Sequence, residues 1–231
     1  MTAPVPLLLP GNMCDSRLWT QAVRDALPGA RDIALRTETT IDAMARKALA
    51  ETDGPVLPVG FSMGGIVALA MARLAPERIA AMILLDTNAS ADLPERAAVR
   101  PRQQAAVRGG DLERIVVEEL KPNYLAAVHR GNRALLDLLR DMAMGLGDDC
   151  FVAQSEALRT RPDQRAVPGQ LAVPLLLACG AEDRLCPPEW HRAMADCAHD
   201  ATLHVIEGSG HMLPLEQPEA LAAIITAWRD R

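Results

Sequence analysis

A serine between two glycines is the point of the chain best suited to chemistry. The segment VLPVGFSMGGIVALAMA (56–72) places Ser62 between Gly60 and Gly64, where one apolar run ends and a second, helical in character, begins. A turn this tight crowds the backbone around the serine, and glycines two residues to either side relieve the crowding. The pattern predicts a hydroxyl held out at the end of a strand, where it can act as a nucleophile.

A serine hydroxyl needs a base, and His211 is the histidine best placed to be one. It lies in EGSGHMLPLEQPE, a predicted loop just past the last predicted strand, where two glycines give the backbone freedom to present the ring. The remaining histidines fall in predicted helices or beside the last strand, where packing or surface roles are expected: His129, His191, His199 and His204.

The acid that would orient this base is sought after the preceding predicted strand. The segment LLLACGAEDRLCPP offers Asp183 and, with less suitable spacing, Glu182. Asp183 could accept the Nδ1–H of the histidine and stabilise the imidazolium. Asp86, at the end of AMILLD, is a third candidate, although structural hydrogen bonds are the expected role there.

Two backbone N–H groups are candidates for stabilising negative charge on a substrate oxygen. One belongs to Met63, which follows the serine at a predicted helix N-terminus. The other should come from LLLPGNMCDSRLW, after the first predicted strand, where Asn12 and Met13 are both open candidates.

The elements that must position these groups alternate between strand and helix. Strands are predicted at 5–10, 32–37, 55–60, 79–86, 173–180 and 201–208, and helices at 16–26 with Ser16 as N-cap, 41–51, 63–75, 188–198 and 217–229. Most of the strands are continuously apolar, as in parallel strands covered on both faces. The pattern predicts an α/β fold with a doubly wound, mostly parallel six-stranded sheet.

Residues 92–170 interrupt this alternation. They contain no convincing strand and two amphipathic helical patterns, 111–128 and 132–146. We expect a helical cap inserted into a core formed by 1–91 and 171–231, because ligands of open α/β sheets bind at the carboxyl ends of the strands.

Composition excludes several classes of function. The 231 residues carry a net charge of −6 with no basic patch, so nucleic acid is not an expected partner. No stretch is long enough to span a membrane, and the N-terminus has no signal-peptide pattern, so a cytoplasmic protein is expected. The five cysteines (Cys14, Cys150, Cys179, Cys186 and Cys197) are expected to be free thiols, and no metal or cofactor is predicted.

The chain resembles the α/β-hydrolase superfamily in four segments, which occur in that family's order. They are LLLPGNMCDSRLW, VGFSMGG, CGAEDRLCPP and GSGHMLPLEQPE. The chain is most similar to small esterases and lactonases, such as 3-oxoadipate enol-lactonases and pimeloyl-ester carboxylesterases. This resemblance implies a triad of Ser62, Asp183 and His211, with Asn12 and Met63 as oxyanion donors. It also implies a small-molecule ester or lactone as the substrate, and no cofactor.

The chain departs from the family pattern in two places. Pro10-Gly11 stands where the family usually has His-Gly, which leaves the donor open between Asn12 and Met13. The usual N-terminal antiparallel hairpin is missing, so six parallel strands are expected instead of eight mixed ones. The elbow residue is Ser and not Asp or Cys, which disfavours epoxide opening, halide displacement and dienelactone-type chemistry.

The same triad leaves other outcomes open: thioester hydrolysis, C–C bond hydrolysis or lyase chemistry, acyl transfer, and a non-catalytic binding role. Aromatic residues make up only 3% of the chain, which favours an aliphatic acyl group. The expected pocket residues are Met13, Tyr124, Leu185 and Met212. The cap arginines, among them Arg96, Arg100 and Arg102, could meet a carboxylate or a phosphopantetheine, with solvent as the default.

Overall fold

The computed structural model describes residues 3–121 and 124–231 and contains one six-stranded sheet with the order β2-β1-β3-β4-β5-β6. Its strands are β1 (Val5–Leu9), β2 (Arg31–Asp32), β3 (Val56–Phe61), β4 (Met82–Leu85), β5 (Leu175–Gly180) and β6 (Ala201–Ile206). All neighbouring strands are parallel. The predicted α/β fold is confirmed, and its carboxyl strand ends all lie at one edge.

Both faces of the sheet are apolar, because successive side chains of a strand point to opposite faces. Leu7 and Leu9 belong to one buried cluster, and Leu8 between them belongs to the other. In β5, Leu175 and Leu177 belong to the first cluster, whereas Leu176 belongs to the second. This explains why the strands read as unbroken apolar runs.

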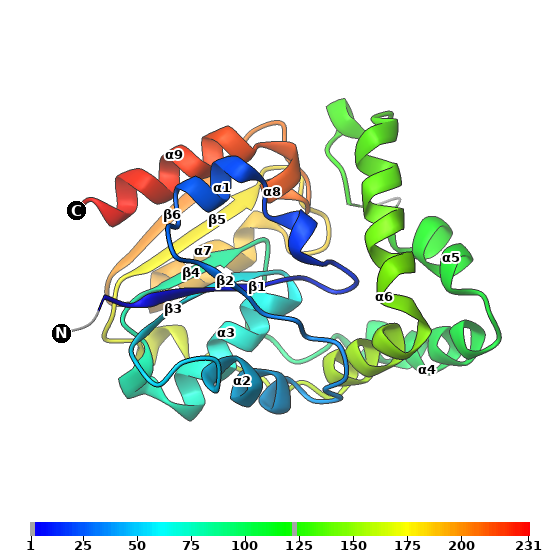
Figure 1. The fold of residues 1–231 in the computed structure, drawn as a ribbon, viewed down its shortest axis with the longest axis horizontal. Coiled ribbons are helices and arrows are strands. Elements are labelled where there is room, and N and C mark those ends of the chain that lie inside the picture. Colours follow the sequence, from blue (N-terminus) through cyan, green and yellow to red (C-terminus); the bar gives the residue numbers. More distant parts are fainter. Residues whose placement is uncertain (1–2, 122–123) are drawn as a thin grey trace.

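Helices cover each face of the sheet. The first cluster includes residues of α2 (Ile41–Leu49), α3 (Met63–Leu74) and α7 (Pro188–Cys197), and the second includes residues of α1 (Gln21–Asp25) and α9 (Pro218–Arg229). Figure 1 shows α1 and α9 together on one side of the sheet and α2 and α3 on the other. Pro188 and Pro218 occupy first helical turns, as predicted.

A helical segment lies between β4 and β5 and beside the sheet (Figure 1). It contains α4 (Pro94–Arg108), α5 (Leu112–Arg114), a π-helical segment η3 (Ile115–Leu120), the short turn η5 (Ala127–His129) and α6 (Arg133–Arg159), whose helical geometry breaks at Gly147. Val107, Ile115 and Phe151 form its own apolar cluster. No strand occurs among the described residues of this segment.

One buried arginine joins the two ends of this helical segment. Arg161 follows α6, and its guanidinium donates to the carbonyl oxygen of Ser90 at 2.9 Å and to the carboxylate of Asp92 at 2.7 Å. Its side chain is 4% exposed and that of Asp92 is 1% exposed. A buried pair that also holds backbone oxygens fixes the start of the segment against its end.

The predicted strand 32–37 is wrong in extent, because β2 covers only Arg31–Asp32. Ile33 still donates its N–H to Leu8, but the chain then leaves the sheet. The carbonyl oxygen of Leu35 instead accepts a hydrogen bond from the side chain of Gln154 in α6, at 2.6 Å. A contact with the helical segment therefore replaces the edge pairing that the apolar pattern suggested.

Two predicted helices are also wrong in extent. Residues 16–26 form a 3-10 turn η1 (Ser16–Leu18) followed by α1, and Asp15 rather than Ser16 caps the turn by accepting from the N–H of Arg17. In the predicted helix 111–128, α5 and η3 end at Leu120, and residues 122–123 lie outside the described ranges. From Tyr124 on, backbone groups bind the core instead of continuing the helix. For example, Tyr124 accepts the N–H of His211.

All five cysteines are free thiols, as expected. Among the described residues, no helix combines the length and apolar character needed to cross a membrane.

The contact between α3 and β1 gives a test of this packing. A Cβ atom on Gly64 would lie 1.9 Å from the carbonyl oxygen of Leu9, so Gly64→Ala forces the helix away from the strand. We expect its free energy of unfolding to fall by about 3 kcal/mol or more. Gly131→Ala is the control, since a Cβ there meets nothing within 4 Å. Urea denaturation measures both, and equal stability of the two variants would contradict the packing argument.

Candidate active site

Ser62 occupies a strained turn between β3 and α3. Its backbone angles are φ 51° and ψ −115°, a region that side-chain-bearing residues rarely adopt. The turn is held by the N–H of Ser62, which donates to Leu85 at 2.9 Å, and by the hydroxyl of Thr87, which donates to the Ser62 carbonyl oxygen at 2.6 Å. A Cβ on Gly60 would lie 2.4 Å from the Gly64 carbonyl oxygen, so the glycine pattern of the sequence is a steric requirement.

The structure brings Ser62, His211 and Asp183 together from three separate segments. His211 Nε2 lies 2.9 Å from Ser62 Oγ, and His211 Nδ1 lies 2.8 Å from Asp183 Oδ2. The second oxygen of Asp183 accepts the N–H groups of Leu185 and Cys186 at 2.8 and 2.9 Å. With Nδ1–H donated to the carboxylate, Nε2 is free to accept the serine proton.

Buried carboxylates hold the loop that carries His211. Glu216 Oε1 accepts the N–H groups of Gly210 and Met212, the residues on either side of the histidine, at 2.9 and 3.0 Å. Its other oxygen accepts the N–H of Ala126 at 2.7 Å. One side chain thus fixes the histidine loop and joins it to the segment that follows η3.

The other candidate acids do not contact the His211 ring through any hydrogen bond. Asp86 accepts the N–H groups of Gly180 at 2.9 Å and Leu213 at 3.0 Å, so it joins the end of β5 to the histidine loop. This agrees with the structural role expected for it. Glu182 accepts the N–H of Ala127 at 2.9 Å.

The charges of the site influence one another strongly. Burial acts to lower the pKa of His211, but the negative charge and hydrogen bond of Asp183 outweigh burial and raise this pKa above its ordinary value. Burial acts to raise the pKa of Asp183, but His211 and two backbone N–H groups hold it below its ordinary value. Burial, together with the nearby charge of Asp183, raises the pKa of Asp86 well above its usual range.

The loop after β1 is attached to α6 by Gln154. The side-chain oxygen of Gln154 accepts the N–H of Met13 at 2.8 Å and the side-chain amide of Asn12 at 3.0 Å. Gln154 is 1% exposed, and Met13 has φ 54°, a strained value that this pair of bonds stabilises. The Met13 N–H is therefore already committed to a partner.

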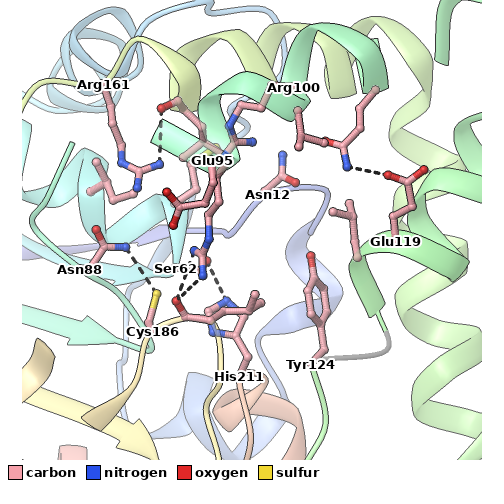
Figure 2. A pocket seen from close by; sticks show the side chains of 18 residues that line it. Asn12, Ser62, Asn88, Glu95, Arg100, Glu119, Tyr124, Arg161, Cys186 and His211 are labelled. Carbon is pink, nitrogen blue, oxygen red and sulfur yellow. Dashed lines mark hydrogen bonds between the residues drawn. The ribbon is translucent and has the colours of Figure 1, made fainter. Parts of the chain in front are cut away.

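A cavity of about 460 Å³ opens beside Ser62 and His211 (Figure 2). Two of the expected pocket residues, Tyr124 and Leu185, line it. The other two do not: Met13 packs into the apolar cluster of the helical segment, and Met212 is buried in the cluster under α9. Aliphatic residues form much of the wall, notably Ile66, Val99, Leu120 and Leu158.

Among the described residues, one group of side chains at the site has the types and spacing that could hold a metal ion. The Cys186 sulfur and one atom each of Asp183 and His211 lie within 4.8 Å of one another. However, Asp183 and His211 are joined by their own hydrogen bond, and burial raises the pKa of the Cys186 thiol far above the range where thiolates form. The arrangement therefore suits proton transfer better than metal binding.

Sequence reasoning missed two residues that organise the site. Gln154 lies near the C-terminal end of the long helix α6. Glu216 ends the short helix α8 (Leu213–Glu216) inside the GSGHMLPLEQPE segment, but the pattern of that segment pointed only to its histidine. Only their positions in space connect them to Asn12, Met13 and His211. No sequence signal of the kind used above would have selected them.

A strained serine after a central parallel strand, hydrogen-bonded to a histidine that follows the last strand, defines an α/β hydrolase. The sequence pattern of the alpha/beta hydrolase family matches residues 7–224, and the chain belongs to this family. The family membership that the four sequence segments suggested is confirmed.

Named relatives include esterases. The chain is 27% identical to the biotin biosynthesis bifunctional protein BioHC of Cellvibrio japonicus over 97% of this chain and 47% of that protein. It is 27% identical to a pimeloyl-[acyl-carrier protein] methyl ester esterase of Neisseria meningitidis over 86% of this chain and 78% of the relative. The chain thus spans about half the length of the bifunctional relative.

A solved structure of similar fold is that of a thermophilic esterase from Thermogutta terrifontis with malate bound. It superposes with a TM-score of 0.90, is 29% identical, and covers 99% of this chain and 90% of the other.

The hydrogen bonds of His211 predict the pH dependence of Ser62 reactivity. Only neutral His211 can accept the serine proton, so labelling of Ser62 by a fluorophosphonate should rise with pH through a midpoint above about 6.5. Asp183→Asn removes the charge that raises this pKa, so the midpoint should move to lower pH. The labelling rate at pH 7 should fall by about 10⁴-fold.

The control for this measurement is Asp53→Asn, an exposed carboxylate with no role in the site. An unchanged midpoint in Asp183→Asn would show that another group titrates.

Proposed function

We propose that this protein is a serine hydrolase that cleaves a small carboxylic ester or lactone through an acyl-enzyme intermediate. The observation that carries the proposal is the continuous hydrogen-bonded chain from Ser62 through His211 to Asp183, which opens onto an aliphatic cavity. The family and the esterases among the relatives support the same class of reaction.

In the proposed reaction, His211 takes the hydroxyl proton as Ser62 Oγ attacks the ester carbonyl carbon. Asp183 stays ionised and stabilises the imidazolium that forms, consistent with its lowered pKa. His211 then protonates the departing alcohol, and in the second half it activates a water that releases the acid from Ser62. The residues supply every proton transfer that the two steps require.

The proposed oxyanion donors are the backbone N–H groups of Met63 and Asn12. Met63 is the first residue of α3, so its N–H has no acceptor within the helix, and the helix dipole favours negative charge there. Asn12 is preferred over Met13 because the Met13 N–H already donates to Gln154. No hydrogen bond engages the Asn12 N–H within the two described ranges.

Residues 92–170 are proposed to act as the cap of this site, because α4, η3 and the end of α6 supply much of the cavity wall. The aliphatic wall favours a small aliphatic acyl group over an aromatic one. The five free thiols fit the reducing compartment expected for a cytoplasmic protein, and this location stays a prediction.

Hydrolysis of p-nitrophenyl esters of increasing acyl length tests the proposed function directly. The wild-type protein should release p-nitrophenol fastest with short aliphatic chains, because the cavity is small. Ser62→Ala should lose at least about 10³-fold in kcat, since it removes the nucleophile. Ser16→Ala, an exposed serine, is the matched control. Wild-type inactivity on every ester, or equal activity of Ser62→Ala, would refute the proposal.

Gln154 gives a second test, aimed at the oxyanion loop. Gln154→Leu removes the acceptor for Met13 and Asn12, so the loop should shift and kcat should fall by up to about 100-fold. Affinity for an alkyl boronic acid, which places a tetrahedral anion on Ser62, should fall in parallel.

Gln104→Leu is the matched control, because this buried cap glutamine contacts Ser155 and Glu156 instead of the loop. Equal losses in the two variants, or unchanged boronate affinity in Gln154→Leu, would mean that Gln154 only stabilises the fold.

A further inference from the structure

Three arginines line the cavity beside Ser62, and two of them share one carboxylate partner. Arg100 donates to Asp92 at 2.6 Å, and Arg161 donates to the same carboxylate at 2.7 Å. Figure 2 shows Arg100 and Arg161 across the cavity from His211 and Tyr124. The buried Asp92 carboxylate is thus engaged by two cations, and each of these guanidinium groups already has a carboxylate partner.

The third arginine, Arg96, has no carboxylate partner among the described residues. Its two terminal nitrogens both donate to the carbonyl oxygen of Leu185, each at 3.3 Å, longer than a usual N–H···O bond. A guanidinium has five N–H donors, so most of its hydrogen-bonding capacity remains unused. Arg96 is half-buried, which makes an unpaired charge there costly in the absence of a ligand.

Neither carboxylate of the cavity wall, Glu95 or Glu119, forms an ion pair with Arg96. Glu119 is engaged by Arg102 at 2.8 Å, Arg114 at 3.1 Å and Gln103 at 3.0 Å. Glu95 also lines the cavity, but it is an exposed residue whose charge water screens, and no ion pair joins it to Arg96 among the described residues. Arg96 is therefore a cavity cation to which no carboxylate is bonded among the described residues, and the shared Asp92 leaves a further net positive charge on Arg100 and Arg161.

Arg96 lies near the reacting groups. It shares the cavity wall with Ser62 and His211, and its charge acts to lower the pKa of the His211 ring. The residue it contacts, Leu185, belongs to the loop whose N–H groups hold Asp183. The same wall includes aliphatic side chains such as Ile66 and Val99.

We propose that Arg96 binds a free carboxylate at the far end of an aliphatic acyl chain, so that the preferred substrate is an ester with a second, ionised carboxyl group. This inference rests on the proposed esterase function and specifies its substrate class. The cavity supplies the apolar wall for the chain and one unpaired planar cation for its end, the arrangement in which arginine recognises carboxylates.

A purely mechanical role for Arg96 is the alternative. Its contact with Leu185 joins α4 to the loop of Asp183, so Arg96 could simply hold the cap against the core. A mechanical role would affect charged and neutral substrates alike, whereas carboxylate binding affects only the charged one.

The test compares mono-p-nitrophenyl adipate with p-nitrophenyl hexanoate, whose six-carbon acyl chains differ in the terminal carboxylate. The wild-type protein should prefer the adipate ester in kcat/KM. Arg96→Gln should reduce this preference by about 10- to 100-fold, because the ratio of the two kcat/KM values cancels any effect on His211 that both esters share. Arg96→Lys should retain part of the preference, because it keeps the charge without the planar pair of donors.

Arg102→Gln is the matched control, since Arg102 lies on the same helix but its side chain is 65% exposed and paired with Glu119. It should keep the wild-type preference. The inference is overturned if the wild-type protein shows no preference, if Arg96→Gln keeps it, or if Arg96→Gln loses both activities equally.

A binding measurement separates this inference from the proposed function. In the Ser62→Ala background, calorimetry should show monomethyl adipate binding at least about 10-fold more tightly than dimethyl adipate, and adding Arg96→Gln should abolish the difference. If neither p-nitrophenyl ester is hydrolysed but this difference is present, the esterase proposal fails and the carboxylate site stands. If the two adipates bind alike, the carboxylate site fails regardless of activity.

Discussion

The structure depends on one steric constraint, the close approach of α3 to the strands that precede and flank it. Gly64 meets the backbone of Leu9, and Gly60 meets the backbone of Gly64, with no room for a side chain at either position. This contact leaves Ser62 at a strained positive φ, directly after the buried strand β3. Two further strained residues, Met13 and Asp86, lie just past β1 and β4, so backbone strain collects along one edge of the sheet.

A strained backbone of this kind is kept only where surrounding hydrogen bonds stabilise it, and here buried side chains supply such bonds. Glu216 holds the N–H groups on both sides of His211, and Asp86 holds the next residue of that loop. Each carboxylate replaces the water that a loop backbone would otherwise bind, so the loop is both buried and satisfied. The position of the histidine is consequently fixed by groups that never touch its ring.

The helical segment contributes to the site as well as covering it. Gln154 on α6 holds the loop after β1, and Met13 of that loop packs into the segment's own apolar cluster. Arg161, after the end of the segment, pairs with Asp92 at its start, and the same carboxylate also pairs with Arg100. Arg96, on the same helix as Arg100, bonds to the carbonyl oxygen of Leu185 and to no carboxylate among the described residues, so the cavity wall carries an excess of positive charge beside Asp92.

The sequence by itself determined the order of strands and helices, the elbow around Ser62 and the loops of Asp183 and His211, because apolar periodicity and glycine spacing are local properties. The short extent of β2 and the backbone from Tyr124 to Ala127 depended on contacts with distant segments. Tertiary structure alone decided that the Met13 N–H is occupied and that Arg96 meets no carboxylate among the described residues. Such assignments depend on which donors and acceptors meet across more than a hundred residues of chain, as Met13 and Gln154 do, and no local pattern records that.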